Sequence, residues 1–216
     1  TYDTVSFLSD FGYQDEFAGV VKSVIRGLAP HAAVVYLNHN VPAYDVRAGS
    51  LSLARAVPYI ASGVVLAIVD PGVGTDRRAV AIEVAGGEGV FVGPDNGLLA
   101  AAVALTGGAE RCVVLNNPAY QLEAEGGTFA GRDIFGPAAG HLCAGLDLAE
   151  LGDPVDPYSL LPGTIPIARE EDGVLQCEVL WIDRYGNVQL NVDADELATY
   201  GDPVRITYSD KSRIVR

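Results

Sequence analysis

Cysteine, positive charge and long apolar runs are all scarce in this 216-residue chain. Its three cysteines, Cys112, Cys143 and Cys177, lie far apart without a C-x-x-C pair, which argues against a disulfide framework or a zinc cage. Such cysteine usage fits a reducing, cytoplasmic setting. No apolar stretch reaches the roughly 18 residues of a membrane-spanning helix, and residues 1–8 carry no basic segment typical of a secretory signal. We therefore expect a soluble cytoplasmic protein without a membrane partner.

Basic residues are outnumbered two to one, with 14 Lys and Arg against 28 Asp and Glu, for a formal net charge of −14. Nucleic-acid binding draws most of its affinity from neutralising phosphates, and anionic membranes likewise attract basic segments. The acidic excess therefore argues against both partners. Hydrophobic residues make up 49% and charged residues 19% of the chain, which indicates a globular protein of one domain or slightly more.

Three frequent catalytic signatures are missing as well. No G-x-S-x-G stretch is present to supply the nucleophile of a serine hydrolase. Residues 70–78 form a glycine-containing loop, but no Gly-Lys-Ser/Thr sequence follows, so the loop is not a phosphate-binding P-loop. The three histidines, His31, His39 and His141, lack metal-ligand spacing, and we expect no metal site.

Strand-like and helix-like segments alternate along the first part of the chain, a pattern typical of layered α/β domains. Residues 64–69 are an unbroken, mostly β-branched run, which predicts a strand buried on both faces of a parallel sheet. In residues 15–28, apolar side chains recur every three to four positions, as on one helical face. The expected strands are residues 5–9, 33–37, 64–69, 79–84, 89–92 and 112–115, and the expected helices are residues 15–28, 45–60, 98–105 and 134–146.

A proline-rich stretch separates this alternation from the rest of the chain. Residues 152–166 contain four prolines and little periodicity, which predicts a linker. The strands expected beyond it, residues 174–182, 188–192 and 204–208, make a small all-β part of about fifty residues. We therefore predict an α/β domain over residues 1–163, with a mostly parallel sheet and flanking helices, and a second domain over residues 164–216.

Three aspartates, Asp10, Asp70 and Asp183, directly follow expected strands and precede turn sequences. Ligands of open parallel sheets bind outside the carboxyl ends of the strands, so Asp10 and Asp70 share one edge if their strands are parallel. The alternative at each position is an Asx turn, in which the carboxylate bonds its own backbone. Two carboxylates at one edge favour a functional site for Asp10 and Asp70.

The loop at residues 70–78 is the strongest candidate for chemistry. Its proline and two glycines let the backbone approach a ligand closely. Arg77 is placed to fold back towards Asp70 and pair with it. The alternative is an exposed ion pair, which contributes under about 1 kcal/mol to the free energy of unfolding.

Other loops offer weaker candidates. Asn96 or Asp95, in the tight loop at residues 93–98, suits capping of the adjoining helix. Phe129 and Tyr44 offer aromatic surfaces for a planar base, with a place in the core as the alternative for both.

Six sequence motifs span the chain nearly from end to end. They are FLSDFG at residues 7–12, AYDVRAG at 43–49, DPGVGTDRR at 70–78, GPDNGLL at 93–99, TFAGRDIFGP at 128–137 and IDRYGNVQLN at 182–191. In this order they resemble one family, the S-adenosyl-L-methionine hydroxide adenosyltransferases, which are related to the fluorinase and chlorinase. The resemblance implies an α/β domain followed by a C-terminal β-barrel, of which this chain would hold a part.

The same resemblance implies a reaction and an assembly. Water attacks C5′ of S-adenosyl-L-methionine (SAM) and gives adenosine and L-methionine. SAM is the substrate, and no metal or other cofactor is implied. The family forms homotrimers with active sites between subunits.

The resemblance further implies individual roles. Asp70 and Arg77 match two members of a water-activating set whose third member, a histidine, falls at Ala130. Gly131 matches a position that is glycine in the hydrolases and serine in the fluorinase. The implied substrate-binding residues are Asp10 for the ribose hydroxyls, Asp15, Glu16 and Phe17 on the methionine side, Tyr44 and Phe129 as aromatic walls, Asn96, and Asp183 with Asn187 from a neighbouring subunit.

Three positions depart from the family pattern: Ala130 replaces the histidine, Tyr36 an aspartate and Asn38 a threonine. Because Ala130 cannot exchange protons, the chain is expected to be an impaired SAM hydrolase or, alternatively, a SAM- or adenosine-binding protein with weak turnover. A SAM-dependent halogenase, which forms a 5′-halo-adenosine, is a further alternative. Asp70 replaces a tyrosine of the halogenases, and its carboxylate would repel a halide.

Overall fold

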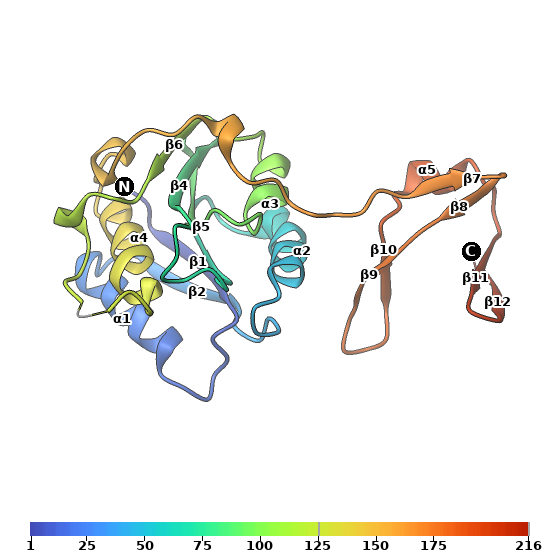
Figure 1. Ribbon diagram of the computed structural model, residues 1–216, viewed down its shortest axis with the longest axis horizontal. Coiled ribbons are helices and arrows are strands. Elements are labelled where there is room, and N and C mark those ends of the chain that lie inside the picture. Colours follow the sequence, from blue (N-terminus) through green and yellow to red (C-terminus); the bar gives the residue numbers. More distant parts are fainter. Residues whose placement is uncertain (125, 216) are drawn as a thin grey trace. The chain divides into compact units, whose positions relative to one another are not determined.

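A computed structural model describes residues 1–124 and 126–215 and divides the chain into two units, Thr1–Thr164 and Ile165–Arg216. Six strands of the first unit form one sheet in the order β2-β1-β3-β5-β4-β6 (Figure 1). Strands from β2 to β5 are parallel, and β4 runs antiparallel to both of its neighbours, which confirms the predicted mostly parallel sheet. The strands are β1 (Thr4–Ser9), β2 (Ala33–Asn38), β3 (Gly63–Ile68), β4 (Ala79–Val84), β5 (Gly89–Pro94) and β6 (Arg111–Val114).

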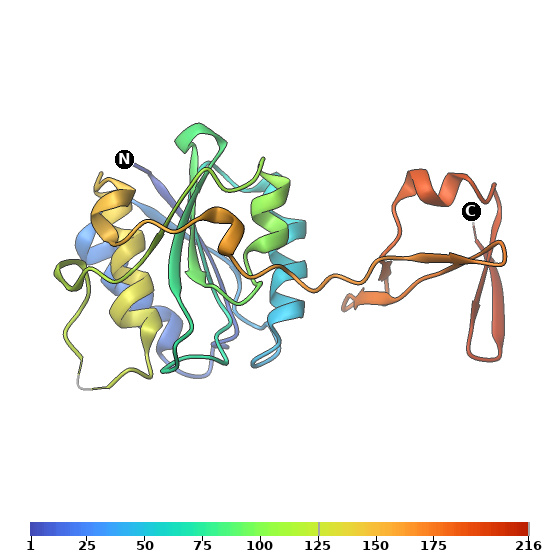
Figure 2. The same ribbon diagram turned by 45° about the horizontal axis from the view of Figure 1, so that its top comes forward.

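Helices cover both faces of this sheet. α1 (Phe17–Leu28) packs against α4 (Gly136–Cys143) on one face, and α2 (Val46–Ala56) packs against α3 (Ala100–Leu105) on the other (Figures 1 and 2). The buried side of α1 carries apolar residues at the predicted spacing. All six residues of β3 are buried, because layers of helices cover both faces of this central strand.

The chain changes direction across the sheet between β1 and β3. From β1 it passes through α1 to β2 on one side, and from β2 through α2 to β3 on the other side of β1. Because α1 and α2 lie on opposite faces, the carboxyl ends of β1 and β3 flank a topological switch point. The fold therefore places the expected crevice directly after Ser9 and Ile68, which pair with one another in the sheet.

The last helix of this unit begins with an irregular turn. Residues Gly131–Phe135 form a π-helical turn in which the amide of Gly136 donates to the carbonyl of Gly131, five residues earlier. Pro137 has no N–H for the carbonyl of Asp133, which instead accepts from the amide of Leu122 at 2.9 Å. The prediction of a regular helix over residues 134–146 is therefore wrong at its start.

The second unit contains three two-stranded antiparallel sheets, and within its described residues they do not close into a barrel. The predicted barrel is thus present only as separate strand pairs. The strand predicted over residues 174–182 is wrong, because it is divided between two of these sheets. The elements are β7 (Arg169–Glu171), β8 (Val174–Gln176), β9 (Val179–Ile182), β10 (Val188–Leu190), α5 (Ala194–Ala198), β11 (Val204–Tyr208) and β12 (Lys211–Val215).

Sequence reasoning missed α5, although its start carries a recognisable signal. The carboxylate of Asp193 accepts from the amide of Glu196, whose own side chain accepts from the amide of Asp193, which is a capping box. In the described part of the chain, we find no helix with both the length and the apolar character needed to traverse a bilayer.

Candidate active site

Asp10 and Asp70 lie at the same edge of the sheet. Asp10 directly follows β1, Asp70 comes two residues after β3, and the amide of Asp10 donates to the carbonyl of Ile68 at 3.3 Å. Burial raises the pKa of Asp10 and the negative charge of Asp70 acts in the same direction, while the amide of Tyr44 opposes both. The structure thus brings the two carboxylates together at the switch point.

Tyr44 lies beside Asp10 in an unusual backbone conformation. Its φ is +65°, which is uncommon for a residue with a side chain. Its amide donates to Oδ2 of Asp10 at 2.8 Å, and its side chain is 71% exposed. The backbone of Tyr44 therefore orients the carboxylate while its ring stays accessible to a ligand.

Arg77 and Asp70 form a sheltered ion pair. Nε of Arg77 donates to Oδ1 of Asp70 at 3.0 Å, and Nη2 donates to Oδ2. The two side chains are only 11% and 6% exposed, and the guanidinium lies 5.3 Å from the ring centre of Phe135. This two-donor geometry in a sheltered place differs from an exposed surface pair, because the position of the Asp70 carboxylate is fixed by its partner.

Asn96 connects the loop after β5 to the loop that carries Asp70. Its Nδ2 donates to the carbonyl of Val69 at 2.9 Å, and its Oδ1 accepts from the amide of Leu98 at 3.1 Å. The expected helix cap is wrong, because the residue before α3 is Leu99, which makes no side-chain cap. The amide group of Asn96 instead holds the backbone next to Asp70.

Three phenylalanines form an apolar wall near Asp10. Phe11, Phe17 and Phe129 pack edge to face, with ring centres 5.2–6.0 Å apart. A Cβ at Gly131 would stand 3.0 Å from Cζ of Phe11 and 3.2 Å from Cε2 of Phe129. Sequence reasoning missed Phe11, although it lies in the same short motif as Asp10. Glycine at position 131 is thus what lets these rings close on one another.

Asp15 and Glu16 precede α1 and are exposed. Glu16 occupies the N-cap position of α1, but its side chain makes no cap hydrogen bond. Both carboxylates are therefore available at the surface beside Phe17.

Ala130 is buried directly before the π-helical turn. The same turn supplies Phe135, which packs on Arg77. The loops on either side of the site also meet, since a Cβ at Gly127 would stand 4.0 Å from Cα of Gly74. Position 130 thus belongs to the segment packed on the Asp70–Arg77 pair, but it offers only a methyl group.

Asp183 and Asn187 lie in the second unit, where they hold a tight turn. Oδ1 of Asp183 accepts from the amides of Tyr185 and Asn187 at 2.8 Å, and Oδ2 accepts from Nδ2 of Asn187 at 2.7 Å. These bonds, chiefly those from Asn187, lower the pKa of Asp183. The arrangement is the Asx turn considered as the alternative, and the structure does not bring these residues together with Asp10 and Asp70 in one unit.

His39 contacts the residues on either side of Asp10. It was not predicted as a site residue from the sequence. Its Nδ1 lies 2.7 Å from Oγ of Ser9, which also accepts from the amide of Phe11, and its carbonyl accepts from the amide of Gly12. The side chain is fully buried, and burial lowers its pKa to about 4. No sequence spacing distinguished His39 from the other two histidines. Over the described residues, no group of three or more His, Cys, Asp and Glu side chains is arranged to hold a metal ion.

Comparison with known proteins adds independent information. A family profile described as the SAM hydroxide adenosyltransferase N-terminal domain matches residues 5–152. A Salinispora tropica protein named (R)-S-adenosyl-L-methionine hydrolase is 41% identical over 210 residues, which cover 97% of this chain and 80% of that protein. A more distant relative, a fluorinase of an Actinoplanes species, is 25% identical over 226 residues. The alignment covers 91% of this chain and 74% of the fluorinase.

A solved structure is similar over nearly the whole chain. The crystal structure of an uncharacterized conserved protein from Thermotoga maritima superimposes with a TM-score of 0.88 at 31% identity. The match covers 97% of this chain and 81% of that one.

Proposed function

The chain belongs to the SAM hydroxide adenosyltransferase family, and from that premise we propose that it is an enzyme that hydrolyses SAM to adenosine and L-methionine. The observation that carries the proposal is the sheltered Asp70–Arg77 pair, placed beside Asp10 at the switch point of the sheet. A carboxylate fixed by two donors, next to a second carboxylate and an aromatic wall, suits a cationic nucleoside and a water molecule.

The chemistry requires little help for the leaving group. The oxygen of water bonds to C5′ while the C5′–S bond breaks, and the sulfonium leaves as the neutral thioether of methionine. Water is a far weaker acid than a carboxylic acid, so Asp70 does not deprotonate it in advance. Asp70 instead holds the water in line and accepts its proton as the C–O bond forms, then returns that proton to solvent. Because the sulfonium is already activated, we propose that no cofactor takes part.

The residues around this pair would bind the rest of SAM. The carboxylate of Asp10 would accept hydrogen bonds from the two ribose hydroxyls. The amide of Tyr44 holds this carboxylate in its orientation. The exposed ring of Tyr44 and the Phe11–Phe17–Phe129 wall would contact the apolar surfaces of the nucleoside. The exposed Asp15 and Glu16 would face the methionine side, where SAM carries its ammonium group.

We further propose a homotrimer, in which Asp183 and Asn187 of a neighbouring subunit complete the site. Supporting this proposal, the second unit exposes several aliphatic side chains that a subunit contact would cover: Val174, Val179, Ile182, Val188 and Ile214. Light scattering tests it, with an expected mass of three times the 22.6 kDa chain. A monodisperse monomer would contradict the proposal. A cytoplasmic location is supported by the free thiols of the three cysteines.

One observation favours a second candidate function. Ala130 has no group that exchanges protons, and it stands where the family resemblance places a histidine. A protein that binds SAM or adenosine with weak turnover is therefore the runner-up, whereas a halogenase is disfavoured by the Asp70 carboxylate.

Chromatography of SAM incubated with the protein, with and without chloride, separates these functions. Release of adenosine and methionine supports the hydrolase. Bound but intact SAM supports the binding protein, and chloride-dependent 5′-chloro-adenosine supports a halogenase.

A further inference from the structure

A second ion pair lies directly beside the proposed catalytic one in sequence. Arg78 follows Arg77, and its Nε donates to Oδ2 of Asp95 at 2.9 Å. The Asp95 side chain is only 4% exposed, whereas that of Arg78 is 33% exposed. The backbone joins the same residues again, because the amide of Asp95 donates to the carbonyl of Arg78 at 2.9 Å. The two loops that carry these residues are thus joined by both side chains and backbone.

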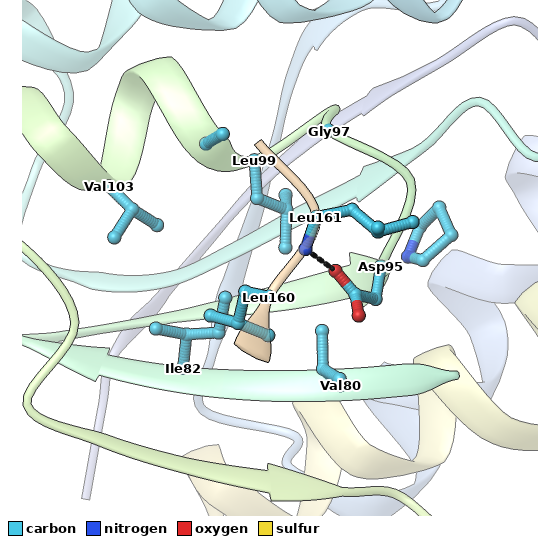
Figure 3. Close-up of a pocket in the computed structure, with 10 residues that line it drawn as sticks. Val80, Ile82, Asp95, Gly97, Leu99, Val103, Leu160 and Leu161 are labelled. Atoms are coloured by element: carbon cyan, nitrogen blue, oxygen red, sulfur yellow. Dashed lines mark hydrogen bonds between the residues drawn. The ribbon is translucent and has the colours of Figure 1, made fainter. Parts of the chain in front are cut away.

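The pair also fastens the segment that leads out of the first unit. Oδ1 of Asp95 accepts from the amide of Leu161 at 2.8 Å, as Figure 3 shows. Arg78 donates from Nη1 to Oγ of Ser159 at 3.0 Å and from Nη2 to its carbonyl. Both oxygens of a nearly buried carboxylate are therefore engaged, one by a guanidinium and one by the backbone of residues 159–161.

The residue after Asp95 is hydrogen-bonded to the start of the proposed catalytic loop. Its neighbour Asn96 donates to the carbonyl of Val69, the residue immediately before Asp70. At the other end of that loop, Arg78 is the neighbour of Arg77. The loop at residues 70–77 is thus followed by Arg78, which bonds the Asp95 carboxylate, and preceded by Val69, which is held by Asn96, the sequence neighbour of Asp95.

The packing beneath this arrangement is incomplete. A cavity of about 40 Å³ is lined by Leu160 and Leu161, by residues of β4 and by residues in and beside α3, and Figure 3 shows these lining residues. Its volume is far below the 300 Å³ or more of typical ligand sites, so it has room for water only. The hydrogen bonds to Asp95 and Arg78 therefore add to the apolar packing in holding residues 159–161.

Building on the proposed hydrolysis of SAM, we propose that Asp95 is a positioning residue, which through Arg78 and Asn96 holds the loop of Asp70 and Arg77 in its reactive geometry. Asp95 does not touch the water or the substrate. It acts by fixing the backbone at Val69 and at Arg78, and it couples that geometry to the placement of residues 159–161. A displacement of about 1 Å in such a loop lowers rates up to about 100-fold.

The test compares Asp95→Asn and the milder Arg78→Lys with a matched control. Glu83→Gln breaks the Glu83–Arg111 pair between β4 and β6, in which Nε and Nη2 of Arg111 donate to the two carboxylate oxygens of Glu83 at 2.7 and 2.6 Å. We expect the Asp95 and Arg78 variants to lower kcat about 10- to 100-fold with KM nearly unchanged. Glu83→Gln should leave both kinetic constants unchanged at a comparable loss of Tm. Equal effects on kcat in the control, or none at Asp95 and Arg78, would overturn the proposal.

A double variant and an activity-independent measurement complete the test. Because Arg78 and Asp95 act through one linkage, Asp95→Asn combined with Arg78→Lys should lower kcat no further than the more severe single change.

In hydrogen exchange, peptides covering residues 69–78 should exchange faster in Asp95→Asn than in the wild type or in Glu83→Gln. If the wild type releases no adenosine, the proposed function fails on its own, and unchanged exchange at residues 69–78 would then overturn the role of Asp95. If Asp95→Asn does not fold, Arg78→Lys carries both measurements.

Discussion

Arg77 donates hydrogen bonds to both oxygens of the Asp70 carboxylate. A carboxylate has about four lone-pair sites, so two remain for a water molecule on the side away from the guanidinium. The pair is sheltered, and Arg77 prevents the carboxylate from rotating. Asp70 is thus held as an acceptor of fixed direction, which is what an in-line attack by water requires.

Replacing Asp70 with asparagine should remove that acceptor with little change in shape. We expect Asp70→Asn to lower kcat by about 10²- to 10⁴-fold, the usual contribution of a positioned acid–base group, while KM changes little. Adenosine release measured by chromatography checks this. Asp76→Asn, an exposed aspartate on the same loop, is the matched control and should keep wild-type kinetics. A kcat that survives in Asp70→Asn would remove Asp70 from the mechanism.

Position 130 offers a test by gain of function. Ala130→His would place a proton-exchanging group in the segment packed on the Asp70–Arg77 pair, and we expect kcat to rise by up to about 10²-fold with KM nearly constant. Asp70→Asn in that background should abolish most of the gain.

Steric effects at position 130 need their own control, because Ala130 is buried. Ala130→Leu adds comparable bulk without an ionisable group, so it should lower stability without raising kcat. If Ala130→His leaves kcat unchanged, water activation depends on Asp70 and Arg77 alone.

Gly131 should tolerate no side chain without movement of the aromatic wall. Gly131→Ser brings a Cβ within 3.0–3.2 Å of Phe11 and Phe129, so the rings must shift. We expect a loss of about 1–3 kcal/mol in the free energy of unfolding, measured with urea, and a higher KM for SAM. Gly19→Ser is the control, because a Cβ at Gly19 meets nothing within 4 Å. Similar behaviour of the two variants would show that the rings near position 131 yield freely.

His39 should make stability depend on pH in a defined window. Its pKa is about 4 in the folded protein against an ordinary value of 6.5, so between these values the unfolded chain binds more protons. The free energy of unfolding should therefore fall as the pH drops from 6.5 to 4, by roughly 3 kcal/mol for this difference in pKa. Urea unfolding measured at several pH values in that range should show that the free energy of unfolding depends less steeply on pH in His39→Gln than in the wild type. His31→Gln, at a histidine whose side chain is 47% exposed, serves as the control variant.

Hydrophobic periodicity in the sequence predicted most of the sheet and its helices, whereas features built on long-range hydrogen bonds escaped prediction. The apolar run at residues 64–69 was enough to predict a central parallel strand, and hence that Asp10 and Asp70 share one edge. The π-helical turn depends on Pro137 releasing the carbonyl of Asp133 to a distant amide at Leu122, which no local pattern shows.

The same limit applies to the candidate site. Arg77 could be paired with Asp70 from the sequence because only seven positions separate them. Asp95 could not be connected to Leu161, 66 residues away, because their contact exists only once the linker packs on the sheet. The helix cap that the sequence predicts at Asn96 is wrong, since the partner of its Nδ2 group, the carbonyl of Val69, is a backbone group without a sequence signature.

The π-helical turn at Gly131–Phe135 also sets the direction in which the residues before it face around the axis of α4. Each residue of an α-helix advances by about 100°, so a turn with one extra residue rotates everything before it by that angle relative to α4. Deleting one residue from this turn would keep α4 in place and swing Ala130 and Gly131 about 100° around the helix axis. The direction in which position 130 faces is therefore governed by a count of residues as much as by which residue stands there.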